Sequence, residues 1–127
     1  MSSDFYTFTD GFIQVFKFNK STDAAVEAWA AALENHIQQT PADQPVYVLL
    51  DVTGDEVTFS AAARQQSKRI FSTHRDRVGY IALLFEWRTS PYFARLFFAS
   101  LGKLTFKMNY FHRTEAARAW LQAVYAA

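Results

Sequence analysis

Short apolar runs recur along the chain, and helical patterns separate them. Val46–Val52 and Gly79–Phe85 are nearly continuous apolar runs, and Leu104–Phe111 alternates between apolar and polar residues. Continuous runs of this length are typical of strands buried on both faces of a partly parallel sheet. Because helices separate these strands, right-handed crossovers are expected to place them parallel, and the sequence predicts a layered α/β domain.

The amino-terminal segment predicts a β-hairpin that precedes the crossover units. Alternating side chains indicate strands over residues 4–9 and 12–18, with Asp10-Gly11 between them as a favoured two-residue type I′ turn. Apolar residues at helical spacing and capping residues predict four helices. They start at Ser21–Asp23, at Thr58 or Ser60, at Ser90-Pro91 and at Thr114-Glu115, and the first three end near Gln39, His74 and Gly102.

The predicted architecture is therefore an α/β (α+β layered) domain of order ββαβαβαβα that spans residues 1–127. We expect a mixed, mostly parallel five-stranded sheet with four helices. Half of the residues are hydrophobic and 17% are aromatic, which is enough to bury a substantial core. The absence of cysteine excludes disulfides, thiolate metal sites and a cysteine nucleophile. No apolar run approaches the roughly 18 residues of a membrane span, and the start is polar, so we expect a soluble, cytoplasmic protein.

Charge is divided unevenly along the chain although the net charge is only +1. Residues 1–56 hold Lys17 and Lys20 against nine acidic residues, and residues 57–127 hold 11 basic and three acidic ones. This asymmetry is compatible with an anionic partner, with self-association of opposite faces, or with solvated helix surfaces. The basic strip of the second helix has no interleaved aromatic residues, so we expect no nucleic-acid binding.

Polar residues follow two of the predicted parallel strands, where a helix also begins. Ligands of open parallel sheets tend to bind at this carboxyl end, and exposed helix N–H groups there favour an anion. The sequence predicts a partner- or anion-binding edge, with ordinary capping and a solvated loop as the alternative. The residues of this predicted edge are Asp51, Thr53, Asp55, Glu56, Glu86, Trp87, Arg88 and Ser90.

Catalytic signatures are not found in the sequence. His36, His74 and His112 are not spaced as a helical zinc pair, and the four glycines form neither a phosphate-binding loop nor a dinucleotide fingerprint. Asp55 and Glu56 are adjacent and point apart, which does not suit a general acid/base pair. The sequence predicts no enzyme activity, no cofactor and no metal site.

The third predicted helix is apolar nearly all round, so we expect its surface to be buried against another group. Its candidate contact residues are Tyr92, Phe93, Phe97 and Phe98. A dimer mate, a lipid-like ligand or a neighbouring loop of the same fold would each cover it.

The element order, the strand at residues 46–53 with its capped helix, and the tail at residues 108–121 resemble a STAS-like domain, and more closely the SpoIIAA-like branch of small bacterial proteins. Members typically end the last strand in Phe and then carry an acidic residue shortly before Ala-x-x-Trp-Leu. Phe111, Glu115 and Ala117–Leu121 stand at those positions. The resemblance covers nearly the whole chain.

This resemblance implies a regulatory interaction module rather than an enzyme. Anti-sigma factor antagonists of this fold are phosphorylated on a serine at the start of the second helix and bind a partner kinase. Ser60 or Thr58 is the nearest matching hydroxyl, although the Asp and Gly of that motif are absent here. The predicted function is a non-enzymatic, homodimeric interaction module whose protein partner the sequence does not identify. The alternative is a small lipid or amphiphile carrier, because the SpoIIAA-like branch is similar in fold to CRAL-TRIO domains.

Overall fold

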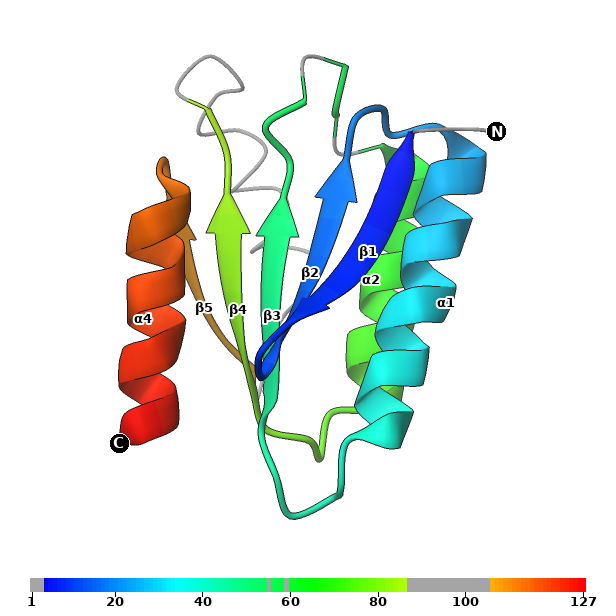
Figure 1. Ribbon diagram of the computed structural model, residues 1–127. Helices are drawn as coiled ribbons and strands as arrows, with labels where there is room; N and C mark the ends of the chain where they lie inside the picture. The colour runs from blue at the N-terminus through cyan, green and yellow to red at the C-terminus, as the bar shows by residue number, and fades with distance from the viewer. Residues whose placement is uncertain (1–3, 55, 59, 87–105) are drawn as a thin grey trace.

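A computed structural model describes residues 4–54, 56–58, 60–86 and 106–127 of the chain. These residues form a five-stranded sheet with strand order β1-β2-β3-β4-β5. The first two strands pair antiparallel, and the three other neighbouring pairs are parallel. Figure 1 shows the elements, which are β1 (Phe5–Asp10), β2 (Ile13–Phe18), α1 (Asp23–Gln39), β3 (Val46–Asp51), α2 (Ala61–Thr73), β4 (Gly79–Leu84), β5 (Phe106–Phe111) and α4 (Thr114–Ala126).

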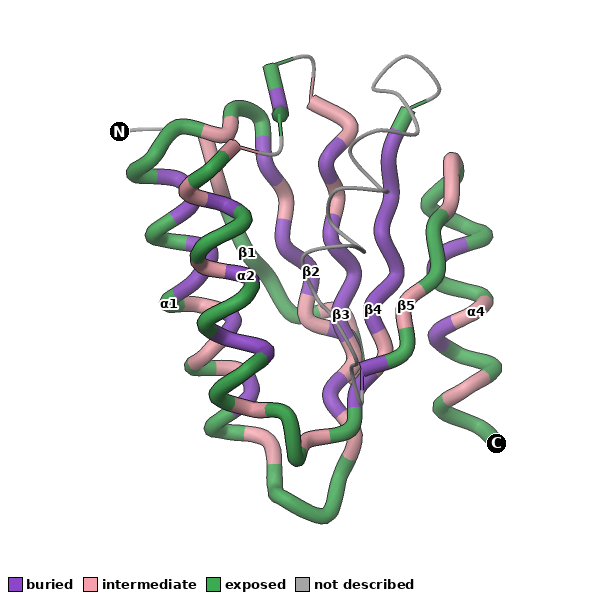
Figure 2. Tube along the Cα trace, turned by 180° about the vertical axis from the view of Figure 1, so that it is seen from behind, coloured by how far each residue is buried: buried purple, intermediate pink, exposed green. Residues whose placement is uncertain are grey.

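Helices cover both faces of the sheet. Helices α1 and α2 lie side by side on one face, and α4 lies on the opposite face (Figure 1). Burial is concentrated along β2, β3 and β4 and on the inner sides of the helices (Figure 2). The strand pattern follows from this arrangement, because alternate side chains of a central strand enter the two different cores.

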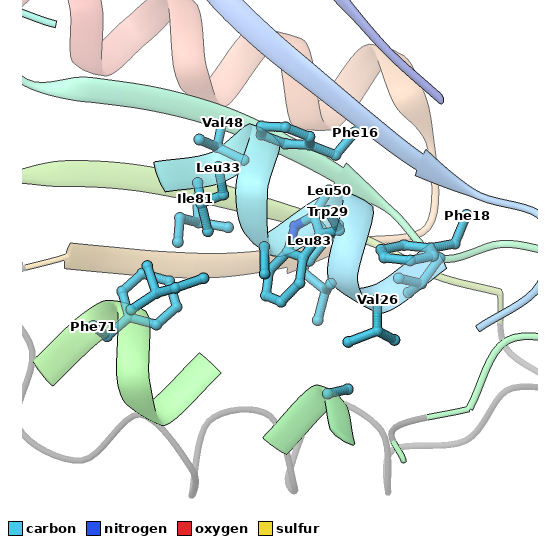
Figure 3. Close-up of a cluster of buried hydrophobic side chains, with 14 of the residues drawn as sticks. Phe16, Phe18, Val26, Trp29, Leu33, Val48, Leu50, Phe71, Ile81 and Leu83 are labelled. Carbon is cyan, nitrogen blue, oxygen red and sulfur yellow. The ribbon is translucent and has the colours of Figure 1, made fainter. Parts of the chain in front are cut away.

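The larger core lies between the sheet and the α1–α2 pair. Figure 3 shows Trp29 and Leu33 of α1 and Phe71 of α2 meeting side chains of β2, β3 and β4. The smaller core contains Ala117 and Leu121 of α4, both fully buried against the other face. The apolar stripes predicted for these helices are therefore confirmed where the structure describes them. The buried α1 residues are Ala25, Val26, Trp29, Ala30, Leu33 and Ile37.

The hairpin is confirmed, but its turn is shifted by one residue from the prediction. Asp10 pairs with Ile13, so Gly11 and Phe12 form the two-residue connection and Asp10 is the last residue of β1. Gly11 has φ 62°, which both primed hairpin turns require at their first central position. Glycine tolerates that conformation better than aspartate, and it therefore sets the register.

Helix starts agree with the predicted caps in two cases and differ in one. Thr22 caps α1 and Ser60 caps α2 through their side-chain oxygens, which accept from the backbone N–H of Ala25 and Ala63. In α4, Arg113 occupies the capping position without a side-chain bond, and Thr114 is the first helical residue. The predicted Thr114 cap is therefore wrong by one position.

The mixed five-stranded α/β fold is confirmed. The described ranges contain three helices where the sequence predicted four. The predicted helix that begins at Ser90 and ends at Gly102 lies outside those ranges, as does Phe59. Within the described ranges, no helix has both the length and the apolar character that crossing a membrane requires.

Candidate functional site

The parallel strands β2, β3, β4 and β5 end at one side of the sheet, which we call the carboxyl edge (Figure 1). Asp51, the last residue of β3, organises the turn that follows. Its Oδ1 accepts from the backbone N–H of Thr53 at 2.9 Å and from the Thr53 hydroxyl at 2.6 Å. Its other oxygen lies 3.9 Å from Nζ of Lys17 on the neighbouring strand. Asp51 therefore has both of its oxygens engaged within the fold.

Gly54 brings the β3–α2 loop against the end of β2. A Cβ atom at this position would lie 2.8 Å from the carbonyl oxygen of Phe18 and 2.9 Å from that of Asn19. Real Cβ atoms do not approach backbone oxygens so closely, so the loop can pack here because residue 54 has no side chain. The close approach joins two loops that are distant in the sequence.

Lys20 and Glu56 lie at the same junction. The two residues form an isolated parallel bridge, and Nζ of Lys20 lies 3.1 Å from Oε2 of Glu56. The hydrogen bond to Glu56, followed by the charges of Glu56 and Asp4, raises the pKa of Lys20 above its ordinary value. Because both side chains are more than half exposed, solvent screens this pair and it adds little to stability.

These contacts surround an open pocket of about 470 Å³. Three of its lining residues come from the predicted edge or its loop, namely Thr53, Gly54 and Glu56, and two come from β2 and its end, namely Lys17 and Asn19. Sequence reasoning missed Lys17, Asn19 and Lys20. The sequence pattern does not specify the parallel pairing of β2 with β3, and it is this pairing that places the end of β2 at the same edge.

The two candidate phospho-acceptors occupy different environments. Thr58 is exposed, its backbone N–H donates to Oγ of Ser21 at 2.8 Å, and the two hydroxyl oxygens lie 3.3 Å apart. The Ser60 hydroxyl is engaged as the cap of α2 and accepts from Ala63 N–H at 3.2 Å. The Ser60 hydroxyl lies at the start of α2, where the helix dipole favours negative charge, whereas Thr58 lies two residues before this cap.

Of the remaining predicted edge residues, the structure describes only Glu86. Glu86 follows β4 at the carboxyl edge and is exposed. The structure therefore brings together Asp51, Thr53 and Glu56, with Thr58 and Ser60 in the same loop. Eight predicted residues lie outside the described ranges, namely Asp55, Trp87, Arg88, Ser90, Tyr92, Phe93, Phe97 and Phe98.

The three histidines have different surroundings. Nδ1 of His112 lies 3.1 Å from the carbonyl oxygen of Phe85. Nε2 of His74 lies 3.2 Å from Oε2 of Glu34, and His36 is near the end of α1. Hydrogen bonding from Arg69 is the main cause that holds the pKa of Glu34 below its usual range. In the described part of the chain, no three metal-ligating side chains come together.

Comparison with known proteins identifies the fold. No family model matches the sequence, and the comparison with curated proteins gives no match. An uncharacterized protein of the DUF3478 family with a SpoIIAA-like fold, from Shewanella loihica PV-4, is similar in structure. The sequence identity is 21% and the TM-score 0.59, over 95% of this chain and 98% of that one. The chain therefore has a SpoIIAA-like fold, as the sequence predicted, and at this identity the likeness concerns the fold alone.

Proposed function

We propose that this protein is a non-enzymatic, single-domain interaction module and that its contact surface is the carboxyl edge. The observation that carries the proposal is the pocket between β2 and the β3–α2 loop, whose walls are fixed by the Asp51–Thr53 bonds and the close approach at Gly54. A preformed polar surface of this kind suits recognition of another surface, because little order has to be gained on binding.

Charge at this edge favours a protein partner over a free anion. Lys17 lies near Asp51, and Lys20 is paired with Glu56, so each lysine has a carboxylate beside it. A small anion would have to compete with these carboxylates for the lysines. A protein surface with charges of both signs instead matches the alternating pairs, and such complementarity supplies specificity.

We further propose that the module forms a homodimer through this edge. Sedimentation velocity over a concentration series tests this, with Glu56→Lys as the edge variant. Glu27→Lys on the exposed side of α1 changes the charge by the same amount and is the matched control. We expect a dimer that Glu56→Lys weakens and Glu27→Lys leaves intact. A monomer at every concentration, or equal effects of the two variants, would contradict the proposed dimer.

Native mass spectrometry of the same samples separates the module from the carrier. A retained adduct of lipid-like mass would overturn the interaction module in favour of an amphiphile carrier. A spectrum that shows a dimer without an adduct supports the module.

We also propose that phosphorylation of Ser60 or Thr58 regulates the module. Intact-mass analysis of protein from its own cells tests this. The expected result is a phosphate-sized mass increase that Ser60→Ala or Thr58→Val removes.

A further inference from the structure

A second pocket lies at the opposite end of the sheet, which we call the amino edge. The β1–β2 turn, the α1–β3 loop and the end of α4 all point to this end in Figure 1. Side chains from these segments line a pocket of about 560 Å³. This volume falls within the range of about 300–1,000 Å³ that is usual for small-molecule sites.

Three aromatic side chains form one wall of this amino-edge pocket. The rings of Phe12 and Tyr125 are stacked with centroids 4.0 Å apart, and Tyr47 meets them edge-on at 5.1 and 5.4 Å. Tyr47 also stacks on Tyr80 with centroids 5.5 Å apart. The inner ring faces are therefore already covered, whereas Tyr125 is 56% exposed. This wall offers ring edges and one outer face, which suit aliphatic C–H groups better than an inserted flat heteroaromatic ring.

The other lining groups are neutral hydrogen-bonding side chains. Gln39 and Gln44 are exposed in the pocket, and each amide has two donor hydrogens and one acceptor oxygen. Nε2 of His36 is buried, and burial lowers the pKa of this imidazole below its ordinary value, although a hydrogen bond with the backbone of Tyr47 opposes the shift. Among the described residues that line the pocket, none is Asp, Glu, Lys or Arg.

Arg77, which does not itself line the pocket, holds one of its walls in place. Arg77 donates to the carbonyl oxygens of Ile37 and Thr40 at 2.9 Å each and to that of Pro41 at 3.2 Å. These three bonds fix the end of α1 and the start of the α1–β3 loop. Charge-assisted hydrogen bonds are among the stronger ones, so these partly buried bonds favour a preformed wall at Gln39.

We propose that the amino-edge pocket binds a small neutral carbohydrate. No described side chain that lines the pocket is Asp, Glu, Lys or Arg, so an ionic ligand would lose hydration without forming an ion pair with the lining, which disfavours phosphates, carboxylates and amines. A sugar ring has C–H groups for the outer face of Tyr125 and hydroxyl groups for the amides of Gln39 and Gln44. Hydroxyls both donate and accept, so they match amide side chains in either orientation.

The test is a titration of the full chain, followed by amide chemical shifts, with glucose, galactose and N-acetylglucosamine as separate probes. Glucose 6-phosphate and adenosine are the comparison ligands. We expect at least one neutral sugar to shift pocket amides in a saturable way and to bind more tightly than both comparison ligands. Failure of all three sugars overturns the proposal, and so does tighter binding of the phosphate or of the nucleoside.

Variants place the binding in this pocket. Tyr125→Ala and Gln44→Ala each remove an exposed lining group and are expected to weaken the sugar affinity, about tenfold for the tyrosine. Tyr110→Ala is the matched control, because Tyr110 is 53% exposed but lies on β5 away from the pocket. Equal weakening by Tyr110→Ala and Tyr125→Ala would overturn the assignment. Unchanged amide spectra outside the mutated regions establish that each variant is folded.

Discussion

The two ends of the sheet carry pockets of similar size, but among the described residues one is lined by charged side chains and the other is not. The carboxyl-edge pocket is lined by Lys17 and Glu56, and the amino-edge pocket is lined by aromatic rings and amides. The first is built from loops that follow parallel strands, and the second from a hairpin turn, a loop before a strand and a helix end. The difference shows that the ends of parallel strands locate one of these pockets, whereas the packing of distant segments creates the other.

Truncation of Leu121 is expected to have the largest effect on stability. It tests how far the amino-edge pocket depends on the packing of α4. The side chain is fully buried, and Leu121→Ala leaves a cavity that lowers the free energy of unfolding by about 3 kcal/mol. Denaturant titration measures this change. Near-ultraviolet circular dichroism should also change, because Tyr125 shifts away from Phe12.

Ile70→Ala is the matched control for that experiment. Ile70 is equally buried, but it lies in α2, which contributes no lining residue to the amino-edge pocket. The loss of stability should be similar, and the part of the aromatic signal that comes from the Phe12–Tyr125 pair should be unchanged. An unchanged aromatic signal in Leu121→Ala as well would show that α4 does not hold the aromatic wall in place.

Glycine substitutions compare the backbone constraints of the two ends. Gly54→Ala places a Cβ atom against two carbonyl oxygens at the carboxyl edge and is expected to cost about 2 kcal/mol of stability. Gly11→Ala at the amino edge meets no atom within 4 Å, so only its positive φ opposes the change and the expected cost is about 1 kcal/mol. Thermal and denaturant unfolding measure both. A larger cost at Gly11 would contradict the close approach of the β3–α2 loop to β2.

The sequence predicted the carboxyl edge better than the amino edge for a physical reason. Asp51 ends a strand and Thr53 follows it two residues later, so their position could be predicted from the chain order alone. Lys17 joins them only through the pairing of β2 with β3, which the apolar pattern does not specify. Tyr125 and Phe12 meet across more than a hundred residues, and no local pattern encodes the packing of α4 that brings them together.

The same limit explains the errors in the predicted elements. Asp10-Gly11 has the composition of a type I′ turn, but the positive φ at Gly11 fixes the first turn position and moves the turn to Gly11-Phe12. Thr114 resembles a helix cap, yet Arg113 already has the extended backbone of the capping position. The buried stripes of α1 and α2 were predicted correctly because their periodicity depends on many residues rather than on one.

Ser60 allows a smaller test at the carboxyl edge. Ser60→Ala removes the oxygen that accepts from Ala63 N–H and is expected to lower stability by about 1 kcal/mol. Ser60→Asp should recover most of that loss, because a carboxylate caps the helix and interacts favourably with its dipole. Chemical unfolding of both variants measures the difference. A Ser60→Asp variant no more stable than Ser60→Ala would show that the start of α2 does not accommodate negative charge.

Histidine titration provides the smallest expected effect and tests the neutrality of the amino edge. Burial lowers the folded-state pKa of His36 below the ordinary value of 6.5. When the pH falls through 6.5, the unfolded chain therefore takes up a proton at His36 that the folded chain does not, and the free energy of unfolding decreases. The stability associated with the neutral, buried His36 is therefore present above pH 6.5 and is lost as the pH falls below it.

His36→Gln should therefore lose less stability than the wild-type protein between neutral and mildly acidic pH, as measured by urea unfolding at a series of pH values. The other two histidines are common to both proteins, so their contribution cancels in the difference. Parallel curves would mean that His36 protonates as readily in the folded chain as in the unfolded one. The amino-edge pocket would then gain a positive charge in mild acid, and its contrast with the charged carboxyl edge would hold only at neutral pH.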